Sequence, residues 1–401
     1  MNIWYIHPYA GSPNWGMSFR PYYLSKNFLS FGHNVTVISS LNHHLSSFPK
    51  DNEGMYDAEG VPYYLVDTKK YYGNGVGRIL NMLGFGKNLF NKKFREFSKQ
   101  NVPDVIIAST AHPFHFIAAN YYAKKFKAKL ILEVRDIWPL SLQELVGISK
   151  FHPLSLLINV FQKFAYRKCD LCVSLLENSK EYLESQGLNG SKFRYIPNGI
   201  EIESNFSDEG APYDLTRLEQ ELKRFDYIIG YTGAIGIPNN LEPLIGAAKI
   251  LEEDNVGVLI IGEGTEKSRL VERAKLDSID NVVFHSKIPK SAVQTAISLC
   301  DAMFINAQPK FLYELGISPN KIFDYMLMNK PVFSGIYSPN NPLQKAGCEV
   351  YFEANSALDL ATKIKRNKES VNSSIKADVR GFAIKNHSYN KLAEQYMDLF
   401  K

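Results

Sequence analysis

Short apolar runs alternate with helical stretches along most of the chain, and this alternation restricts the fold more than any other feature. In the first half, five apolar segments predict strands: 3–7, 33–38, 104–108, 129–134 and 171–176. Strands separated by helical stretches are typical of parallel sheets, because parallel neighbours need long crossover connections. The pattern therefore predicts an α/β fold in which helices cover both faces of a sheet.

The alternation stops at the turn Pro197-Asn198-Gly199 and the polar run 201–210, and then it starts again. Pro, Asn and Gly favour turns, and the polar run has the composition of a linker. Beyond it, six more segments predict strands: 226–231, 256–261, 281–284, 302–305, 331–334 and 349–352. We expect two doubly wound, Rossmann-like domains over residues 1–200 and 201–389, and a final helix over 390–401.

Length and charge narrow the classes of function. The 401 residues are 45% hydrophobic, which suffices for two domains with cores of their own. The net charge of +5 is uneven, since residues 1–207 carry +7 and residues 208–401 carry −2. Residues 69–129 hold 12 basic and 2 acidic residues. No zinc-ligand spacing, RNP-like motif or basic tail accompanies this charge, so we expect no nucleic-acid partner.

The basic stretch 69–129 is interleaved with aromatic residues, and two interpretations of it remain open. Residues 78–99 could form a broken amphipathic helix at an anionic membrane surface. They could equally form a core helix with a solvated basic face. The N-terminal segment has no basic leader, and no apolar run reaches the roughly 18 residues of a membrane span. We expect a cytoplasmic protein, bound peripherally to the inner face of the plasma membrane.

Four cysteines in a chain of this length suit a reducing compartment. Cys169 and Cys172 are close together, but no second Cys or His pair lies near them. We therefore expect these two side chains to pack in a core and not to bind zinc.

The segment from Ser318 to Pro331 predicts a loop, a short helix and the start of a strand. Ser318 is the expected N-cap, Pro319 suits the first helical turn, and Pro331 ends the helix. The N–H groups and dipole at a helix start favour an anion, and Lys321 adds a formal charge. Asp324 follows one turn later, where its carboxylate suits the two hydroxyls of a ribose. These residues predict a nucleotide-sugar site; a capped helix without a ligand is the simpler alternative.

The same residues resemble the donor site of the GT-B glycosyltransferases of family 4, whose usual pattern is Glu, seven residues, Glu. Asp324 then takes the place of the second glutamate, which holds the ribose, and Gly316 stands where the first would be. Glu314 lies two positions earlier. A Ser-Pro-Asn-Lys motif before an acidic residue is similar to the amino-deoxysugar branch, such as the L-fucosamine transferases. The resemblance implies that the donor is bound by Ser318, Asn320, Lys321 and Asp324.

Two glycine-containing loops follow predicted strands, where such sheets bind ligands. Gly16 permits close backbone approach to a sugar or diphosphate, and Arg20 on the next helix is within reach of the same anion. The second loop, 262–264, has Lys267 where a dinucleotide fingerprint would have its third glycine, so we expect no dinucleotide cofactor. The resemblance implies that Lys267 contacts the donor diphosphate and that backbone near Ile288 reads a uridine base.

Two further strand-end loops bear on the reaction centre. The sequence from Arg135 to Pro139 resembles the Arg-Asp-x-Trp-Pro motif of the amino-deoxysugar branch. The resemblance implies that Asp136 positions the acceptor and that Arg135 contacts a phosphate, whereas a charged pair that caps the strand is the alternative. For His112, a catalytic role and loop packing both remain open.

The resemblance implies a GT-B architecture, with two Rossmann-like domains facing a central cleft and a C-terminal helix that crosses back to the first domain. It further implies transfer of a sugar, with retention of configuration and without a covalent enzyme intermediate. The expected donor is a UDP-sugar and the expected acceptor a polyprenyl-diphosphate-linked saccharide, as in O-antigen or capsule assembly. No Asp-x-Asp motif is present, so we expect neither metal nor cofactor. An epimerase or hydrolase of the same fold, and a noncatalytic sugar-nucleotide-binding protein, remain alternatives.

Overall fold

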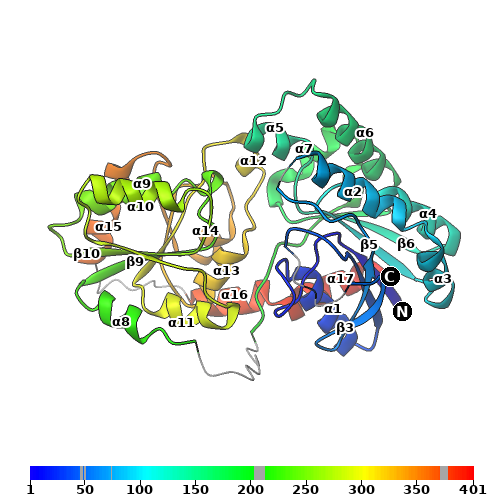
Figure 1. Cartoon of the computed structure of the whole chain (residues 1–401), viewed down its shortest axis with the longest axis horizontal. Coiled ribbons are helices and arrows are strands. Elements are labelled where there is room, and N and C mark those ends of the chain that lie inside the picture. Colours follow the sequence, from blue (N-terminus) through cyan, green and yellow to red (C-terminus); the bar gives the residue numbers. More distant parts are fainter. Residues whose placement is uncertain (46–47, 49–50, 74, 203–212, 371–377) are drawn as a thin grey trace. The chain divides into compact units, whose positions relative to one another are not determined.

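The computed structural model describes residues 1–401 except 46–47, 49–50, 74, 203–212 and 371–377. Two compact units make up the described chain (Figure 1): Met1–Gly199 with Tyr389–Lys401, and Ile200–Ser388. The domain boundaries expected from the sequence lie one residue after each of these two breaks. Most of the predicted linker, 201–210, falls outside the described residues.

The sheet of the first unit has the strand order β3-β4-β2-β1-β5-β6-β7-β8. All neighbours are parallel except β3 and β4, which are antiparallel. The strands are β1 (Asn2–Ile6), β2 (Asn34–Ser40), β3 (Gly54–Ala58), β4 (Val61–Val66), β5 (Val105–Thr110), β6 (Lys129–Val134), β7 (Leu171–Ser174) and β8 (Phe193–Tyr195). The strand order reverses between β1 and β5, which is where sheets of this kind leave a crevice for a ligand.

The five strands predicted in this half are present, but β3, β4 and β8 were not predicted. β3 and β4 form a hairpin whose turn residues Glu59 and Gly60 have φ angles of 53° and 84°. Two consecutive positive φ values are typical of a type I′ turn. The Glu-Gly pair before the apolar run 61–66 was therefore the signal that could have revealed the hairpin.

Helices cover both faces of the first sheet (Figure 1). They are α1 (Arg20–Ser30), α2 (Val76–Asn88), α3 (Lys92–Gln100), α4 (Phe116–Phe126), α5 (Leu140–Val146), α6 (Pro153–Lys168), α7 (Lys180–Ser185) and α17 (Tyr389–Phe400). Neighbouring residues of β1 show the two layers. Tyr5 shares a buried cluster with α1 and α17, whereas the ring of Trp4 lies 5.5 Å from those of Phe94 in α3 and Tyr122 in α4. This alternation follows from the period of two along a strand.

The sheet of the second unit is wholly parallel, with the order β11-β10-β9-β12-β13-β14. Its strands are β9 (Tyr227–Thr232), β10 (Val256–Ile261), β11 (Val282–His285), β12 (Ala302–Ile305), β13 (Val332–Ser334) and β14 (Glu349–Tyr351). They correspond to the six predicted segments. The order is that of a Rossmann fold, and it reverses between β9 and β12. Both faces are apolar, since Leu259 and Ile260 of β10 belong to different core clusters.

The helices of the second unit are α8 (Thr216–Leu222), α9 (Glu242–Ile250), α10 (Lys267–Leu276), α11 (Val293–Ser298), α12 (Phe311–Glu314), α13 (Asn320–Leu327), α14 (Pro342–Ala346), α15 (Ala357–Glu369) and α16 (Val379–His387). After α16 the chain returns to the first unit, where α17 packs on α1. The rings of Tyr23 in α1 and Tyr389 in α17 stack at 5.0 Å. The predicted fold class, including the returning C-terminal helix, is thus confirmed.

The predicted amphipathic segment 78–99 forms parts of α2 and α3, but most of its aromatic residues face the core. Phe85 and Phe94 are fully buried and Phe97 is nearly so, while Leu80 and Leu83 of α2 are exposed. The aromatic part of the segment therefore fits the core interpretation. Cys169 and Cys172 are buried and unpaired, as expected for core side chains.

Candidate functional site

The loops after β9 and β10 in the second unit hold each other through their backbones. The N–H of Gly233 donates to the carbonyl of Ile261, and the N–H of Ile235 donates to that of Glu263. A Cβ atom on Gly262 would lie 1.9 Å from the carbonyl oxygen of Gly233, so no side chain fits between the loops. Gly262 also has a φ of 154°, which favours glycine. The glycines thus leave backbone groups exposed at the ends of two central strands.

Lys321 lies beside these loops, in the first turn of α13. Its Nζ donates to the hydroxyl of Tyr231 at 2.8 Å and lies 4.0 Å from the centroid of that ring. A Cβ atom on Gly233 would lie 2.8 Å from the same nitrogen. Burial lowers the pKa of Lys321 to about 7, and no ion pair with a described carboxylate offsets this effect. The site therefore contains a desolvated cation at a helix start, an arrangement that suits an anion.

The predicted helix start is off by one residue. α13 begins at Asn320, and Pro319 is its N-cap in an extended conformation without a side-chain capping bond. Ser318 is buried and precedes the cap. Asn320 therefore occupies the first helical position, and Pro319 adopts the extended backbone that an N-cap requires. As predicted, the helix ends before Pro331.

Asp324 lies one turn beyond Lys321 and forms an ion pair that the sequence did not predict. Both of its carboxylate oxygens accept from Lys290 Nζ, at 2.6 and 2.7 Å. Both side chains are partly exposed, so the pair is accessible to a ligand. A ribose that bound to Asp324 would therefore share this carboxylate with Lys290 or displace it. Lys290 lies 34 residues away in sequence, and no local pattern connected the two.

The predicted diphosphate contact, Lys267, is held within its own loop. Its Nζ donates to Glu263 at 2.8 Å and to the carbonyl oxygen of Gly262 at 3.0 Å. Ile288 lies in the loop after β11 and packs against the core of the second unit. Lys267 and Ile288 therefore follow β10 and β11, two strands of the unit to which Lys321 belongs.

The missing first acidic residue of the motif has a structural reason. Gly316 has a φ of 129°, a conformation that residues with a Cβ rarely adopt. A glutamate at this position would strain the backbone, so the loop itself disfavours the usual side chain. Glu314 ends the short helix α12, two residues before this glycine.

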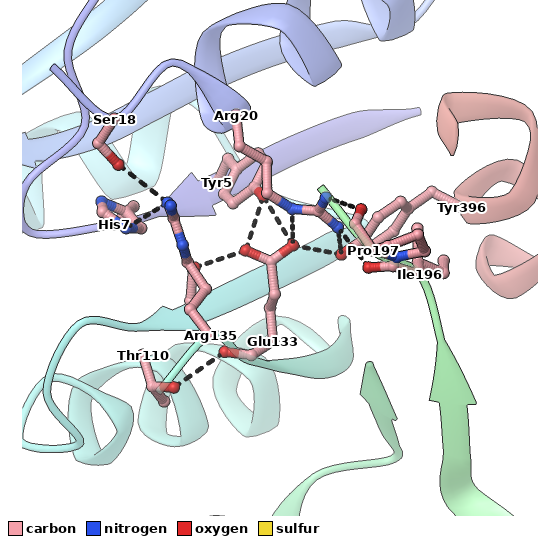
Figure 2. Close-up of polar contacts among 11 residues, drawn as sticks. Tyr5, His7, Ser18, Arg20, Thr110, Glu133, Arg135, Ile196, Pro197 and Tyr396 are labelled. Atoms are coloured by element: carbon pink, nitrogen blue, oxygen red, sulfur yellow. Dashed lines mark hydrogen bonds and ion pairs between the residues drawn. The ribbon is translucent and has the colours of Figure 1, made fainter. Parts of the chain in front are cut away.

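In the first unit, Arg20 and Glu133 form a fully buried ion pair (Figure 2). Arg20 Nε lies 2.8 Å from Glu133 Oε2, and the other guanidinium nitrogens donate to the carbonyl oxygens of Ile196 and Pro197. Tyr5 and Tyr396 also donate to Glu133. Burial would raise the pKa of Glu133, but Arg20 and the other partners outweigh it, so the pKa is lowered.

This network corrects the expectation for Arg20. We expected its guanidinium to reach the donor diphosphate, yet a carboxylate and two carbonyl oxygens already engage it inside the first unit. Its side chain is completely buried, so a phosphate contact would require the pair to break. Arg20 instead ties α1 to β6 and to the turn that precedes the second unit. Sequence reasoning missed this role because the partners lie up to 376 residues apart.

Arg135 follows the end of β6 and points toward the loop after β1 (Figure 2). Its guanidinium lies 3.0 Å from His7 Nε2 and donates to Ser18 Oγ at 2.9 Å. Asp136 comes next and is accessible to solvent. The surrounding protein raises the pKa of this carboxyl by desolvation, against the opposing charges of Arg135 and Arg78. The motif thus places a carboxyl at the end of β6 and a cation that reaches from there to the loop after β1, across β5.

His112 lies near this point with two other buried histidines. His112 and His115 stand 5.3 Å apart between ring centroids, and the ring of Tyr9 lies 5.9 Å from that of His112. Burial lowers the pKa of His43 and of His115 to about 3, and it also lowers that of His112. Within the described residues, neither ring nitrogen of His112 has a hydrogen-bond partner. Burial therefore favours the neutral form of His112, in which one ring nitrogen can donate a hydrogen bond and the other can accept one.

Gly16 lies in the loop after β1, as predicted, and has a φ of 121°. A Cβ atom on Gly11 would lie 2.5 Å from the carbonyl oxygen of Met17, so the two ends of this loop are in close contact. Gly16 and Arg135 follow β1 and β6 of the first unit, with β5 between these two strands. Another six candidate residues belong to the second unit: Lys267, Ile288, Ser318, Asn320, Lys321 and Asp324.

The described residues provide neither a metal site nor a membrane-spanning helix. No group of three or more His, Cys, Asp or Glu side chains is arranged to hold a metal ion. Among the described helices, none combines the length and apolarity that a bilayer span requires.

Two family models match the chain. The model described as Glycosyltransferase Family 4 matches residues 16–204, and the model described as Glycosyl transferases group 1 matches residues 216–338. Each model lies almost entirely within one compact unit. The match confirms the glycosyltransferase class that the sequence predicted.

Known proteins agree with these models. WcaI of Escherichia coli K12, named as a colanic acid biosynthesis glycosyl transferase, is 23% identical over 205 residues. The alignment covers 51% of this chain and 50% of WcaI, so the chain spans about half of the length of this relative. Sucrose-phosphate synthase from Thermosynechococcus elongatus has a TM-score of 0.75 at 14% identity, over 99% of this chain and 98% of its own. Anabaena HepE in complex with UDP has a TM-score of 0.69 at 13% identity, over 100% of this chain and 99% of its own. These structures confirm the GT-B fold.

Proposed function

The chain is built from the two domains of a GT-B glycosyltransferase, and from this premise we propose that it moves a sugar from a UDP-sugar to a lipid-linked saccharide during the assembly of a surface polysaccharide. One observation carries the proposal. Lys321 presents a desolvated ammonium group at the start of α13, and Asp324 follows one turn later. A diphosphate and the ribose next to it need these two groups at this spacing.

The donor side of the proposal rests on charge. Lys321 has a pKa near 7 because burial disfavours its charged form, so a bound diphosphate would restore the charge. The exposed backbone of the glycine loops offers further N–H donors beside it. Among the similar structures, HepE is described in complex with UDP, which supports a uridine nucleotide as the leaving group.

The acceptor side rests on the first unit. Arg135 and Asp136 follow β6, and the Arg135 guanidinium contacts His7 after β1. His112, with its two unpartnered ring nitrogens, follows β5 between these strands. A cation suits the diphosphate of a polyprenyl-linked saccharide, and the carboxyl and imidazole suit its sugar hydroxyls. The name of WcaI refers to colanic acid biosynthesis, which supports an acceptor of this class. The motif from Arg135 to Pro139 favours an N-acetylated amino-deoxysugar as the transferred unit.

We propose that transfer proceeds with retention and without a protein nucleophile. The bond from the anomeric carbon to the donor diphosphate breaks, and the acceptor oxygen bonds to the same face of that carbon. The acceptor proton passes to the leaving diphosphate, whose developing charge Lys321 and Lys267 stabilise. A single such contact is worth about 10²–10³ in rate. Since lysine charges meet this need, we expect no dependence on a metal ion.

Nucleotide release from a panel of UDP- and GDP-sugars, with and without a polyprenyl-diphosphate saccharide, tests the proposal. We expect release from a UDP-sugar that requires the acceptor and is lost in Asp324→Ala. Asp277→Ala, at the exposed end of α10, is the matched control and should keep full activity. Release without an acceptor would instead indicate an epimerase or hydrolase. Nucleotide binding without turnover would indicate a noncatalytic carrier.

A further inference from the structure

We infer that α2, α4 and α6 of the first unit form a surface that docks on an anionic lipid bilayer. The choice of a lipid partner rests on the proposed function, because a lipid-linked acceptor lies in a membrane. The surface itself rests on the distribution of apolar and charged side chains over these helices, which is independent of any activity.

α6 has an apolar side that no described part of the chain covers. Leu156 and Val160 are 50% and 65% exposed, and Leu157 beside them is also exposed. Ser155, Ile158 and Gln162 face inward on the same helix. Leu156 and Val160 are four residues apart, so they lie on one stripe of the helix surface. A solvated surface helix would carry polar residues there.

The two neighbouring helices extend this apolar surface. α4 contacts both α6 and α2, so the three helices lie next to one another on one face of the sheet (Figure 1). Ile117 and Tyr121 of α4, four residues apart, are exposed, as are Leu80 and Leu83 of α2. The loop before α6 adds Phe151, which is 73% exposed. Adjacent exposed apolar residues on three packed helices differ from the scattered ones of ordinary surfaces.

The charge on the same helices has one sign. α2 and α4 each contain two basic residues and α6 contains three, and none of the three helices contains Asp or Glu. The helices that follow α2 and α4 in the chain, α3 and α5, each carry one acidic residue, Glu96 and Glu144. Apolar residues flanked by Lys and Arg alone are the pattern of a surface that inserts shallowly among anionic headgroups. Long basic side chains keep their charges in the headgroup layer while their stems lie on apolar groups.

The charge also decides between a bilayer and a second copy of the chain. A symmetric dimer through α2, α4 and α6 would place the same basic residues of two copies against one another, and like charges oppose such a contact. A bilayer with anionic lipids offers the opposite charge and an apolar layer together. The surface therefore fits a membrane better than it fits itself.

Flotation with vesicles tests the inference on the full chain. Phosphatidylcholine vesicles that contain phosphatidylglycerol should bind the protein, and phosphatidylcholine alone should bind it weakly. The double variant Leu156→Glu with Val160→Glu should lower binding by at least about tenfold, because two charges replace inserted apolar groups. Leu276→Glu with Leu358→Glu changes more exposed apolar residues of the second unit and should leave binding unchanged.

A second variant tests the charge. Lys124→Gln with Lys125→Gln and Lys163→Gln should weaken binding about fivefold for each lysine at low salt, and less at high salt. Both variants should keep wild-type transfer to a water-soluble acceptor, so a failure of docking and a failure of the proposed function can be told apart. Equal vesicle binding by the wild type and both variants would overturn the inference. Self-association that the glutamates abolish, without vesicle binding, would overturn it as well.

Discussion

Each unit holds a cation in the first turn of a helix, Arg20 in α1 and Lys321 in α13, but the two cations have different surroundings. Arg20 in the first unit is completely buried and paired with Glu133 at 2.8 Å. Lys321 in the second unit donates to the hydroxyl of Tyr231 and has no carboxylate partner among the described residues. Burial lowers the pKa of Arg20, but Glu133 and the neighbouring tyrosines together outweigh it and raise this pKa, whereas burial alone lowers the pKa of Lys321.

These surroundings suggest different roles, a structural one for Arg20 and a ligand-binding one for Lys321. Neutralising one partner of a buried pair leaves the other charge without compensation, so such a pair is costly to break. A desolvated cation without a counter-charge gains most from an external anion. The comparison therefore assigns Arg20 to the stability of the first unit and Lys321 to the binding of the donor.

The largest expected effect comes from breaking the buried pair. Glu133→Gln should lower the free energy of unfolding of the first unit by about 3–5 kcal/mol, because Arg20 stays buried without a counter-charge. Chemical denaturation followed by circular dichroism measures this loss. Glu394→Gln removes a half-exposed pair with Lys391 on α17 and serves as the control, with a change under about 1 kcal/mol. A loss below 1 kcal/mol in Glu133→Gln would show that the pair is not structural.

Removing the charge of Lys321 should lower activity without lowering stability. Lys321→Met should slow sugar transfer about 10²–10³-fold, since the developing charge on the diphosphate loses its nearest cation. Its free energy of unfolding should not fall, because a desolvated charge leaves the protein. Steady-state kinetics and denaturation of the same preparation check both parts. Lys275→Met, on α10, is the control, and equal rates for the two variants would remove Lys321 from the donor site.

The smallest effect is expected for the exposed ion pairs of the second unit. Glu242 pairs with Arg269 and Arg273 of α10, and all three side chains are partly exposed. Glu242→Gln should therefore cost only about 0.2–1 kcal/mol, less at high salt. Denaturation at two salt concentrations measures it. A cost as large as that of Glu133→Gln would mean that exposure does not explain the difference between the pairs.

The fold could be predicted because parallel strands are buried on both faces and appear as continuous apolar runs. The bounds predicted from the run 256–261 are those of β10, because every residue of this strand is buried and apolar or Gly. The edge strands β3 and β8 escaped detection because they are short and alternate in burial. Their pairing depends on neighbours that are distant in sequence, which local patterns do not report.

The candidate site could be predicted only where its residues share a local element. Lys321 and Asp324 lie one turn apart on α13, so the period of a helix was enough to predict from the sequence that they are close in space. Lys290, the partner of Asp324, and Tyr231, the partner of Lys321, come from other parts of the chain. No local sequence pattern indicated either contact. The expectation for Arg20 failed for the same reason, because Glu133 is 113 residues away.

The pH dependence of UDP binding tests the central claim, that Lys321 awaits the donor diphosphate, most directly. Its pKa of about 7 in the free protein should rise when the anion binds. Above pH 7 binding must then take up a proton, so the affinity should fall by up to about tenfold per pH unit between pH 7 and 9. Without UDP, the free energy of unfolding should rise with pH over the same range, because the unfolded chain keeps its proton longer.

Calorimetric titrations in two buffers with different ionisation enthalpies measure the affinity and the proton uptake together. The ratio of wild-type to Lys321→Met affinity removes the ionisation of UDP itself. The account predicts that this ratio falls as the pH rises above 7 and that wild type alone takes up a proton. A ratio that does not change with pH, with no proton uptake by the wild type, would contradict it.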